Sequence, residues 1–213
     1  MLQLNDVEIR RAGNRLFPPV NVQVHAGEVL SVMGPSGCGK STLLSAIVGD
    51  MAPVFAFSGA VLCHDQRVDV LPMEQRKIGL LYQDDLLFPH LNVSENLCFA
   101  LPAGLSRAAQ QERIRNALAE ADLVGFESRD IATLSGGQRA RVSVLRCLLA
   151  EPKAVLLDEP FSRLDVTLRG QFRDWVFTEL RQRQVPVILV THDAADCPSG
   201  HRYDLLTGVQ TAC

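Results

Sequence analysis

The 213-residue sequence predicts an α/β fold, and three observations carry that prediction. Residues 29–33 form a short apolar run that enters a glycine-rich turn, and the turn leads into a helical pattern. Residues 154–157 and 187–190 are continuous apolar runs followed at once by polar residues. Such runs are typical of strands buried on both faces of a parallel sheet. Between residues 88 and 150 the apolar spacing is helical instead.

The order of these patterns along the chain predicts the domain organisation. Alternating apolar residues before residue 34 predict strands, and the spacing of Leu43, Leu44 and Ile47 predicts a helix that Gly49 ends. Further short strands follow up to about residue 81, with breaks that include one at Gly59. We therefore expect an α/β core interrupted by a helical subdomain. The core covers residues 1–87 and 150–213, and the helical subdomain covers residues 88–149.

Composition excludes several classes of protein. Hydrophobic residues make up 47% of the chain, which is ordinary for a globular protein, and a net charge of −3 is not that of a basic nucleic-acid binder. The longest apolar run, residues 97–101, is far too short to cross a membrane, and the N-terminus has no targeting pattern. The six cysteines form no metal-like spacing. We expect a soluble, cytoplasmic chain with no nucleic-acid partner.

A phosphate-binding motif follows the strand at residues 29–33 and opens the next helix. Its pattern is G-x-x-x-x-G-K-[ST], in which glycine N–H groups and a helix N-terminus surround an anion. Lys40 is expected to reach the β- and γ-phosphates, and the Ser41 hydroxyl is expected to bind Mg²⁺. A chance glycine-rich turn is the alternative, and the strand-helix context argues against it. The motif comprises Gly34, Pro35, Ser36, Gly37, Cys38, Gly39, Lys40, Ser41 and Thr42.

A second anion-binding pattern precedes the helix that carries Val142 and Leu145. There a serine hydroxyl, two glycine N–H groups and a helix N-terminus converge. The residues are Ser135, Gly136, Gly137 and Gln138, and Leu134 completes the pentapeptide Leu-Ser-Gly-Gly-Gln. This pentapeptide is the hallmark of ABC-type ATPases, and the sequence resembles that family from residue 34 to residue 192.

The resemblance implies a fold and further site residues. The fold is a P-loop NTPase, with a RecA-like core of parallel sheet, an antiparallel β subdomain and an inserted ABC-type helical subdomain. The run 155–160 is similar to the Walker B strand, so Asp158 is expected to bind Mg²⁺ and Glu159 to act as the catalytic base. On an extended chain these neighbours would point to opposite sides.

Three further segments match the family order. Gln83 resembles the Q-loop glutamine, which contacts Mg²⁺ or the attacking water, and His192 resembles the H-loop histidine that contacts the γ-phosphate. Alone, these two residues would be an exposed glutamine and a structural histidine. The run 162–165 resembles the D-loop, with Arg163 where alanine is commonest.

The resemblance also implies partners. The sequence is similar to the ATP-binding subunits of bacterial small-solute importers, which implies ATP and Mg²⁺ as cofactors and a location on the cytoplasmic face of the membrane. The two phosphate-binding motifs would complete each other only across a two-fold axis, so we expect a second ATPase subunit, identical or paralogous. Permease subunits are expected, and a solute-binding protein is a further possibility. Candidate permease contacts, each of which core packing would also explain, are Leu86, Leu87, Phe88 and Leu91.

The sequence departs from the family near residues 8–15, where an aromatic residue that stacks on adenine is often found. Arg10, Arg11 or Phe17 are alternatives for that stacking, and exposed arginines without this role are another. Two other classes of function stay open. One is a non-transport ABC ATPase of DNA repair or translation, and the other is a regulatory module that binds nucleotide without turnover. The retained Lys40, Asp158 and Glu159 argue against the second.

Overall fold

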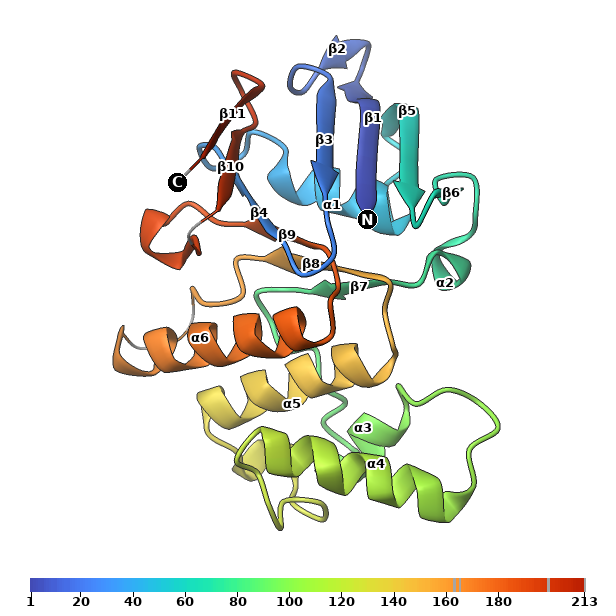
Figure 1. Ribbon diagram of the computed structural model, residues 1–213, viewed down its shortest axis with the longest axis vertical. Coiled ribbons are helices and arrows are strands. Elements are labelled where there is room, and N and C mark those ends of the chain that lie inside the picture. The colour runs from blue at the N-terminus through green and yellow to red at the C-terminus, as the bar shows by residue number, and fades with distance from the viewer. Residues whose placement is uncertain (163, 165, 199, 213) are drawn as a thin grey trace. The chain divides into compact units, whose positions relative to one another are not determined.

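The computed structural model describes residues 1–162, 164, 166–198 and 200–212 (Figure 1). Contacts divide the chain into two compact units. Unit 1 comprises Met1–Leu80, Lys153–Glu159 and Phe177–Cys213, and unit 2 comprises Leu81–Pro152 and Pro160–Val176. Of the predicted D-loop, Arg163 and Asp165 lie outside the described residues.

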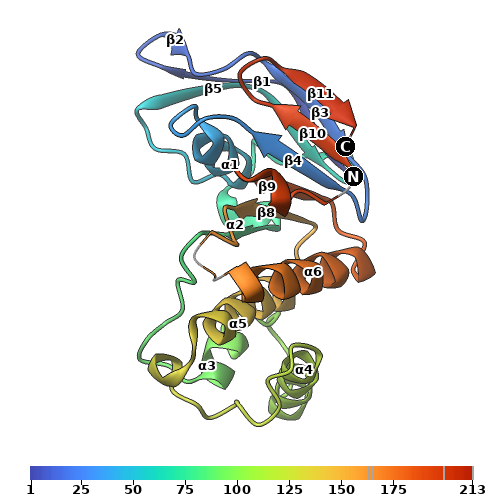
Figure 2. The same ribbon diagram turned by 90° about the vertical axis from the view of Figure 1, so that its left-hand side faces the viewer.

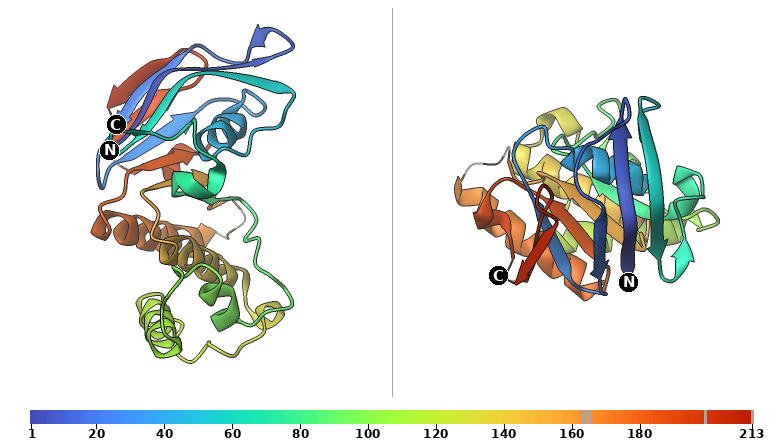
Figure 3. Two further views of the ribbon diagram at one scale, coloured as in Figure 1. Left: turned by 90° about the vertical axis from the view of Figure 1, so that its right-hand side faces the viewer. Right: turned by 90° about the horizontal axis from the view of Figure 1, so that it is seen from above.

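Unit 1 contains a five-stranded antiparallel sheet in the order β2-β1-β5-β6, with β3 also paired to β1. Figure 3 shows the long strands of this sheet side by side. The strands are β1 (Leu2–Arg11), β2 (Asn14–Arg15), β3 (Val20–Val24), β5 (Phe55–Cys63) and β6 (Gln66–Arg67). This sheet corresponds to the predicted antiparallel β subdomain.

The break expected at Gly59 is wrong, because β5 runs through this residue without interruption. At Gly59 the φ angle is +102°, and a Cβ atom there would lie 2.4 Å from the backbone oxygen of Asp6. The register between β1 and β5 shifts at the same place, between Asn5 and Glu8. Glycine therefore permits a close approach of two paired strands instead of ending one of them.

The second sheet has six strands in the order β11-β10-β4-β9-β8-β7. Within this sheet the pairs β10–β4, β4–β9 and β9–β8 are parallel, as the apolar runs predict. Strand β11 pairs with β10 in the antiparallel direction, at the edge of the sheet. The strands are β4 (Val29–Met33), β7 (Ile78–Leu81), β8 (Ala154–Asp158), β9 (Val187–Val190), β10 (His201–Asp204) and β11 (Val209–Ala212).

Helix α1 (Lys40–Val48) packs between the two sheets of unit 1 (Figure 2). Its buried Leu43, Leu44 and Ile47 join a core that includes Leu4 of β1 and Leu30 of β4. The predicted helix and its glycine end are confirmed, since Gly49 caps α1 in the left-handed conformation. The remaining short helices of this unit are α2 (Met73–Arg76) and the 3₁₀ turn η2 (Ala194–Asp196).

Unit 2 is built from helices around a separate apolar core. Ile114, Ala117 and Leu118 face this core from α4, as their spacing predicts, and Leu145 faces it from α5. The elements are α3 (Val93–Cys98), α4 (Arg107–Glu120), the 3₁₀ turn η1 (Ile131–Thr133), α5 (Gly136–Leu149) and the first part of α6 (Val166–Gln182). Within the residues that the structure describes, no helix has the length and apolarity needed to span a membrane.

Candidate functional site

The loop between β4 and α1 carries the predicted phosphate-binding motif, and its glycines adopt conformations that other residues disfavour. Gly37 has a φ angle of +79° and Gly39 one of +103°. A Cβ atom on Gly39 would lie 3.0 Å from the ring of Phe17, which is buried at 3% exposure. Phe17 therefore supports the loop from the core. Its ring is buried here, so it is not available to stack on a base.

The start of α1 leaves its first backbone N–H groups without a side-chain acceptor. Gly39 is the N-cap residue, it makes no side-chain cap, and the first turn contains no acidic residue. Unpaired N–H groups at a helix N-terminus form a binding site for anions. Lys40, only 6% exposed, donates from Nζ to the backbone oxygens of Gly34 (2.8 Å) and Pro35 (2.9 Å). The ammonium group thus lies inside the same loop.

Two oxygen ligands suited to Mg²⁺ lie together at the end of β8. The Ser41 side chain, from the first turn of α1, lies close enough to the Asp158 carboxylate to favour its charged form. Burial raises the pKa of Asp158 above its ordinary value, and the carboxylate of Glu159 adds to the rise, while Ser41 and Lys40 oppose it. A hydroxyl and one carboxylate fit the hard-cation preference of Mg²⁺, which usually takes its other ligands from water and phosphate.

Glu159 follows Asp158 but does not continue the strand. Its φ angle is +48°, and its N–H donates to the backbone oxygen of Val190 (2.9 Å). The expectation that these neighbours point to opposite sides assumes an extended chain, and that assumption is wrong because Glu159 itself is left-handed. Such a conformation is uncommon outside glycine and clusters at functional positions. The Glu159 Oε1 atom lies 3.1 Å from Nδ1 of His192, whose side chain is 57% exposed.

In unit 2, Ser135 and Gln138 form a capping box at the start of α5. The Ser135 Oγ atom accepts from the Gln138 N–H (3.3 Å), and Gln138 Oε1 accepts from the Ser135 N–H (2.9 Å). Gly136 and Gly137 fill the first turn. Because the hydroxyl oxygen acts as the acceptor, its proton is free to be donated to another group. The predicted anion-binding pattern is thus carried by a well-defined helix start.

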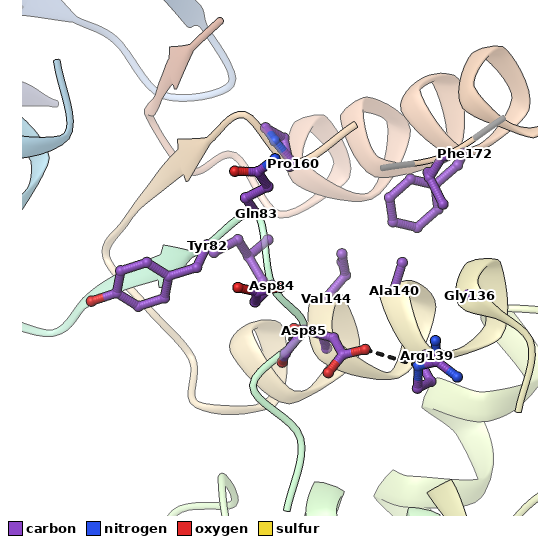
Figure 4. A pocket seen from close by; sticks show the side chains of 13 residues that line it. Tyr82, Gln83, Asp84, Asp85, Gly136, Arg139, Ala140, Val144, Pro160 and Phe172 are labelled. Carbon is purple, nitrogen blue, oxygen red and sulfur yellow. Dashed lines mark hydrogen bonds and ion pairs between the residues drawn. The ribbon is translucent and has the colours of Figure 1, made fainter. Parts of the chain in front are cut away.

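The segment that follows exposed Gln83 is fixed to α5 by polar side chains. The Asp85 carboxylate accepts from Arg139 Nε (3.0 Å), as Figure 4 shows. Its backbone oxygen accepts from the Ser143 hydroxyl (2.9 Å), and Arg146 donates to the backbone oxygen of Leu86 (2.9 Å). Arg139, Ser143 and Arg146 lie at spacings of four and three residues, so they share one face of α5.

A cavity of about 260 Å³ lies beside this segment, within unit 2. Figure 4 shows Gln83, Asp85 and Arg139 on its wall, together with the ring of Phe172 from α6. The Arg139 guanidinium also donates to the backbone oxygen of Leu134, directly before the capping box (2.8 Å). One side chain therefore contacts both the segment after Gln83 and the residue before Ser135.

The rest of the loop before α3 is held by Asn96, which is fully buried. Its amide accepts from the Phe88 N–H (2.8 Å) and donates to the backbone oxygens of Phe88 (3.1 Å) and Leu91 (3.1 Å). Leu86 is 54% exposed, whereas Leu87 is 8% exposed and belongs to the core. Of the two explanations left open for Leu87, core packing is the one that the structure shows.

Contacts at the hairpin between β1 and β2 distinguish Arg10 from Arg11, the two arginines considered for stacking on adenine. Arg10 and Arg15 both pair with the buried carboxylate of Glu8. The Arg11 guanidinium instead lies 6.0 Å from the ring centroid of Phe55 on the paired strand β5. Arg11 is therefore better placed than Arg10 for a stacking role.

Comparison with known proteins places this arrangement in a family. The family described as "ABC transporter" matches residues 17–162. The chain belongs to the ABC transporter family. It is 51% identical to the ABC transporter ATP-binding protein YnjD of Escherichia coli K12 over 199 residues, which covers 93% of this chain and 92% of that protein. The resemblance to bacterial importer subunits, and to the YnjD-like group among them, is confirmed.

Other ABC relatives include named import proteins that are longer than this chain. The chain is 35% identical to the Fe(3+) ions import ATP-binding protein FbpC of Escherichia coli O157:H7, covering 92% of the chain and 56% of that protein. It is 36% identical to the spermidine/putrescine import ATP-binding protein PotA of Bacillus cereus, covering 93% of the chain and 60% of that protein. The chain thus spans a little over half of each of these two relatives.

Solved ABC structures share the fold. CbiO1 of Clostridium perfringens, part of the ABC transporter complex cbiONQ, aligns with a TM-score of 0.85 and 26% identity over 99% of this chain and 88% of that chain. The ATP-binding cassette MJ0796, a dimer in a post-hydrolysis state bound to ADP and Pi, aligns with a TM-score of 0.80 and 27% identity over 100% and 98%. The P-loop NTPase fold is confirmed, and the chain is an ATP-binding ATPase subunit of an ABC transporter.

The ABC motifs did not reveal every residue that shapes the site. Arg139, Ser143 and Arg146 were missed, although their helical spacing beside the pentapeptide is a usable signal. Buried Asn96 and Arg76 had no such signal, because a single polar residue in a sequence does not reveal its burial. Ser162, at the start of the predicted D-loop, is partly buried.

Proposed function

We propose that this ABC ATPase hydrolyses ATP as one half of a pair and thereby powers import of a small solute through separate membrane subunits. The observation that carries the proposal is the proximity of motif residues within unit 1, where Nδ1 of His192 lies 3.1 Å from Oε1 of Glu159 and Ser41 lies beside Asp158. The first pair joins the segments that follow β8 and β9, and the second brings the end of β8 next to α1, which opens at the phosphate-binding loop. This arrangement supports phosphoryl transfer, in which catalysis is mostly positioning and charge stabilisation.

The nucleotide is held mainly by backbone groups. The loop from Gly34 to Thr42 surrounds the phosphates, and Lys40 exchanges its present carbonyl partners for phosphate oxygens. Ser41 and Asp158 would hold Mg²⁺, which when bound would neutralise charge on the phosphates. Arg11 stacks on the base.

Hydrolysis requires a water molecule in line with the γ-phosphorus. Glu159 accepts a proton from this water as the new P–O bond forms, and ADP leaves with the electron pair of the broken bond. His192, next to Glu159, contacts the γ-phosphate and orients the carboxylate. The left-handed backbone at Glu159 aims the carboxylate in a direction that a continued strand would not.

The second half of each site comes from a partner subunit. Ser135, Gly136, Gly137 and Gln138 of one subunit contact the γ-phosphate held by the other, and ATP closes the pair. Closure performs work only because ATP binds the closed state more tightly than the open state. The dimeric ADP-bound relative supports this arrangement.

The membrane partner is a permease, contacted by Leu86, Phe88 and Leu91 of unit 2. Exposed Leu86 on a loop fixed by Asn96 and Arg146 supports a preformed contact surface. The named import relatives and the cbiONQ complex support permease subunits, and a solute-binding protein completes an importer. The chain then lies on the cytoplasmic face of the membrane and needs no nucleic-acid partner.

Purification from detergent-solubilised membranes tests this proposal. The tagged chain is expected to bring down a multi-span protein, and adding that protein is expected to raise the ATPase rate of the purified subunit. The Leu86→Asp variant is expected to lose the interaction, and exposed Val124→Asp is its control. Recovery of a nucleic-acid-bound complex without any membrane protein would contradict the transport function.

A further inference from the structure

Arg76 of α2 is a buried cation whose partners are backbone carbonyls. The side chain is 8% exposed, and its guanidinium donates to the oxygens of Ala46 (2.9 Å) and Ile47 (2.8 Å) in the last turn of α1. It also donates to the oxygens of Leu71 and Asp69, each at 2.9 Å. A charge placed in this setting is costly, and burial lowers the pKa of Arg76 below its ordinary value.

The helix that Arg76 contacts is the one that opens at the phosphate-binding loop. Helix α1 has nine residues, so its two ends are only about 13 Å apart. Its last turn contains no basic residue of its own, and the Ser45 oxygen is already used by the N–H groups of Gly49 and Asp50. Arg76 therefore supplies both the positive charge and the hydrogen bonds that the next two carbonyls lack.

The surrounding turn is shaped to admit this guanidinium. A Cβ atom on Gly49 would lie 2.8 Å from Arg76 Cζ and Nε. Glycine at this position thus serves two purposes, since it also adopts the left-handed cap of α1 with a φ angle of +97°. The end of the helix and the arginine fit each other closely.

We propose that Arg76 is a positioning residue for ATP binding, because it fixes the far end of α1 and so sets where the N–H groups of its first turn meet the phosphates. The effect has two sources: the hydrogen bonds hold the helix in place, and the positive charge favours the negative phosphates at the opposite end. The inference rests on the proposed ATP site.

Two substitutions separate these sources. Arg76→Lys keeps the charge, but a lysine ammonium group cannot reach all four carbonyls as the planar guanidinium does. Arg76→Gln keeps part of the hydrogen bonding but loses the charge. We expect the Kd for ATP to rise about fivefold in Arg76→Lys and about tenfold in Arg76→Gln, with kcat at saturating ATP unchanged. The Kd for pyrophosphate, which has no base, is expected to rise by the same factors.

The matched controls are Arg67→Lys and Arg67→Gln. Arg67 lies near the same turn and pairs with Asp69, but its side chain is 55% exposed and does not contact α1. Calorimetry at a temperature well below the melting point of each variant measures affinity in folded protein. Lower melting temperatures with unchanged Kd values would overturn the proposal and leave Arg76 a purely structural residue. Failure of the unsubstituted protein to bind ATP would instead contradict the proposed function itself.

Discussion

The loop between β4 and α1 and the loop between β7 and α3 are both candidate functional segments, and they are held in different ways. The first is shaped by glycines with positive φ angles, and its one charged side chain, Lys40, contacts the backbone of the loop itself. The second is fixed from outside by polar side chains of α3 and α5, chiefly Asn96, Arg139 and Arg146. One segment is thus defined by backbone conformation and the other by hydrogen bonds from its neighbours.

This difference predicts different responses to mutation. In the first loop the glycines hold backbone conformations that other residues disfavour, so a single substitution there is expected to weaken ATP binding. In the second loop several side chains hold Asp85 and Leu86, so the loss of one half-exposed partner is expected to be tolerated. A buried partner such as Asn96 is the exception, because its loss leaves polar groups unsatisfied.

Glu159→Gln has the largest expected effect, and it tests the proposed catalytic base, which follows β8 and lies in the same unit as the first loop. Removing the proton acceptor is expected to lower kcat for ATP hydrolysis by about a hundredfold or more, while ATP binding persists. The control is Glu151→Gln, because Glu151 also has a positive φ angle (+51°) and pairs with exposed Arg113. Steady-state phosphate release measures both rates. An unchanged rate in Glu159→Gln would exclude this residue as the base.

Gly37→Ala tests whether backbone conformation defines the phosphate loop. Gly37 and Gly13 have nearly equal φ angles, +79° and +82°, and neither has an atom within 4 Å of an added Cβ. Both Ala variants should therefore lose about 1 kcal/mol of unfolding free energy. Only Gly37→Ala is expected to weaken ATP binding, by about tenfold, because only Gly37 lies in the proposed phosphate-binding loop. Equal Kd values for the two variants would break the comparison.

Asn96→Ala tests the second region. The variant leaves the Phe88 N–H group and the Leu91 carbonyl without their partner, so we expect a loss of about 3 kcal/mol of unfolding free energy. The control Asn92→Ala removes only the capping box of the same helix, α3, at a cost of about 1 kcal/mol. Urea denaturation measures both. Similar losses would show that the loop does not depend on the buried amide.

Arg139→Ala has the smallest expected effect. Arg139 and Asp85 have 36% and 34% of their side chains exposed, so their coupling energy in a double-mutant cycle should be below about 1 kcal/mol. The coupling is expected to fall as salt is added, because exposed charges are screened. A larger coupling that resists salt would mean that a single ion pair holds this loop after all.

Periodicity and turn chemistry predicted most of the core. The helix after Lys40, its end at Gly49 and the buried strands β8 and β9 are all as the sequence indicates. The antiparallel edge strand β11 was not predicted, because β10 and β11 are short and mostly polar. The sequence predicts a break at Gly59 because it does not reveal that two backbones must approach there.

The sequence identifies the motif residues because their spacing is specific, but it does not predict their backbone geometry. Asp158 and Glu159 were expected to differ by strand alternation, and a positive φ angle at Glu159 separates them instead. Such local strain has no signature in composition or periodicity. The supporting residues Arg76 and Asn96 have no sequence signal for a related reason. The role of each arises from burial among backbone carbonyls, which for Arg76 come from the distant helix α1 and for Asn96 from the neighbouring loop.

The size of the Glu159→Gln variant in the presence of MgATP tests most directly the claim that two subunits share each nucleotide. Size-exclusion chromatography with light scattering is expected to give twice the 23.4 kDa mass of one chain. Adding Ser135→Arg is expected to return the mass to 23.4 kDa without loss of ATP binding, whereas Ser106→Arg, at the N-cap of α4, is expected to keep the dimer. A variant that stays monomeric at saturating ATP, or a dimer that survives Ser135→Arg, would contradict the account.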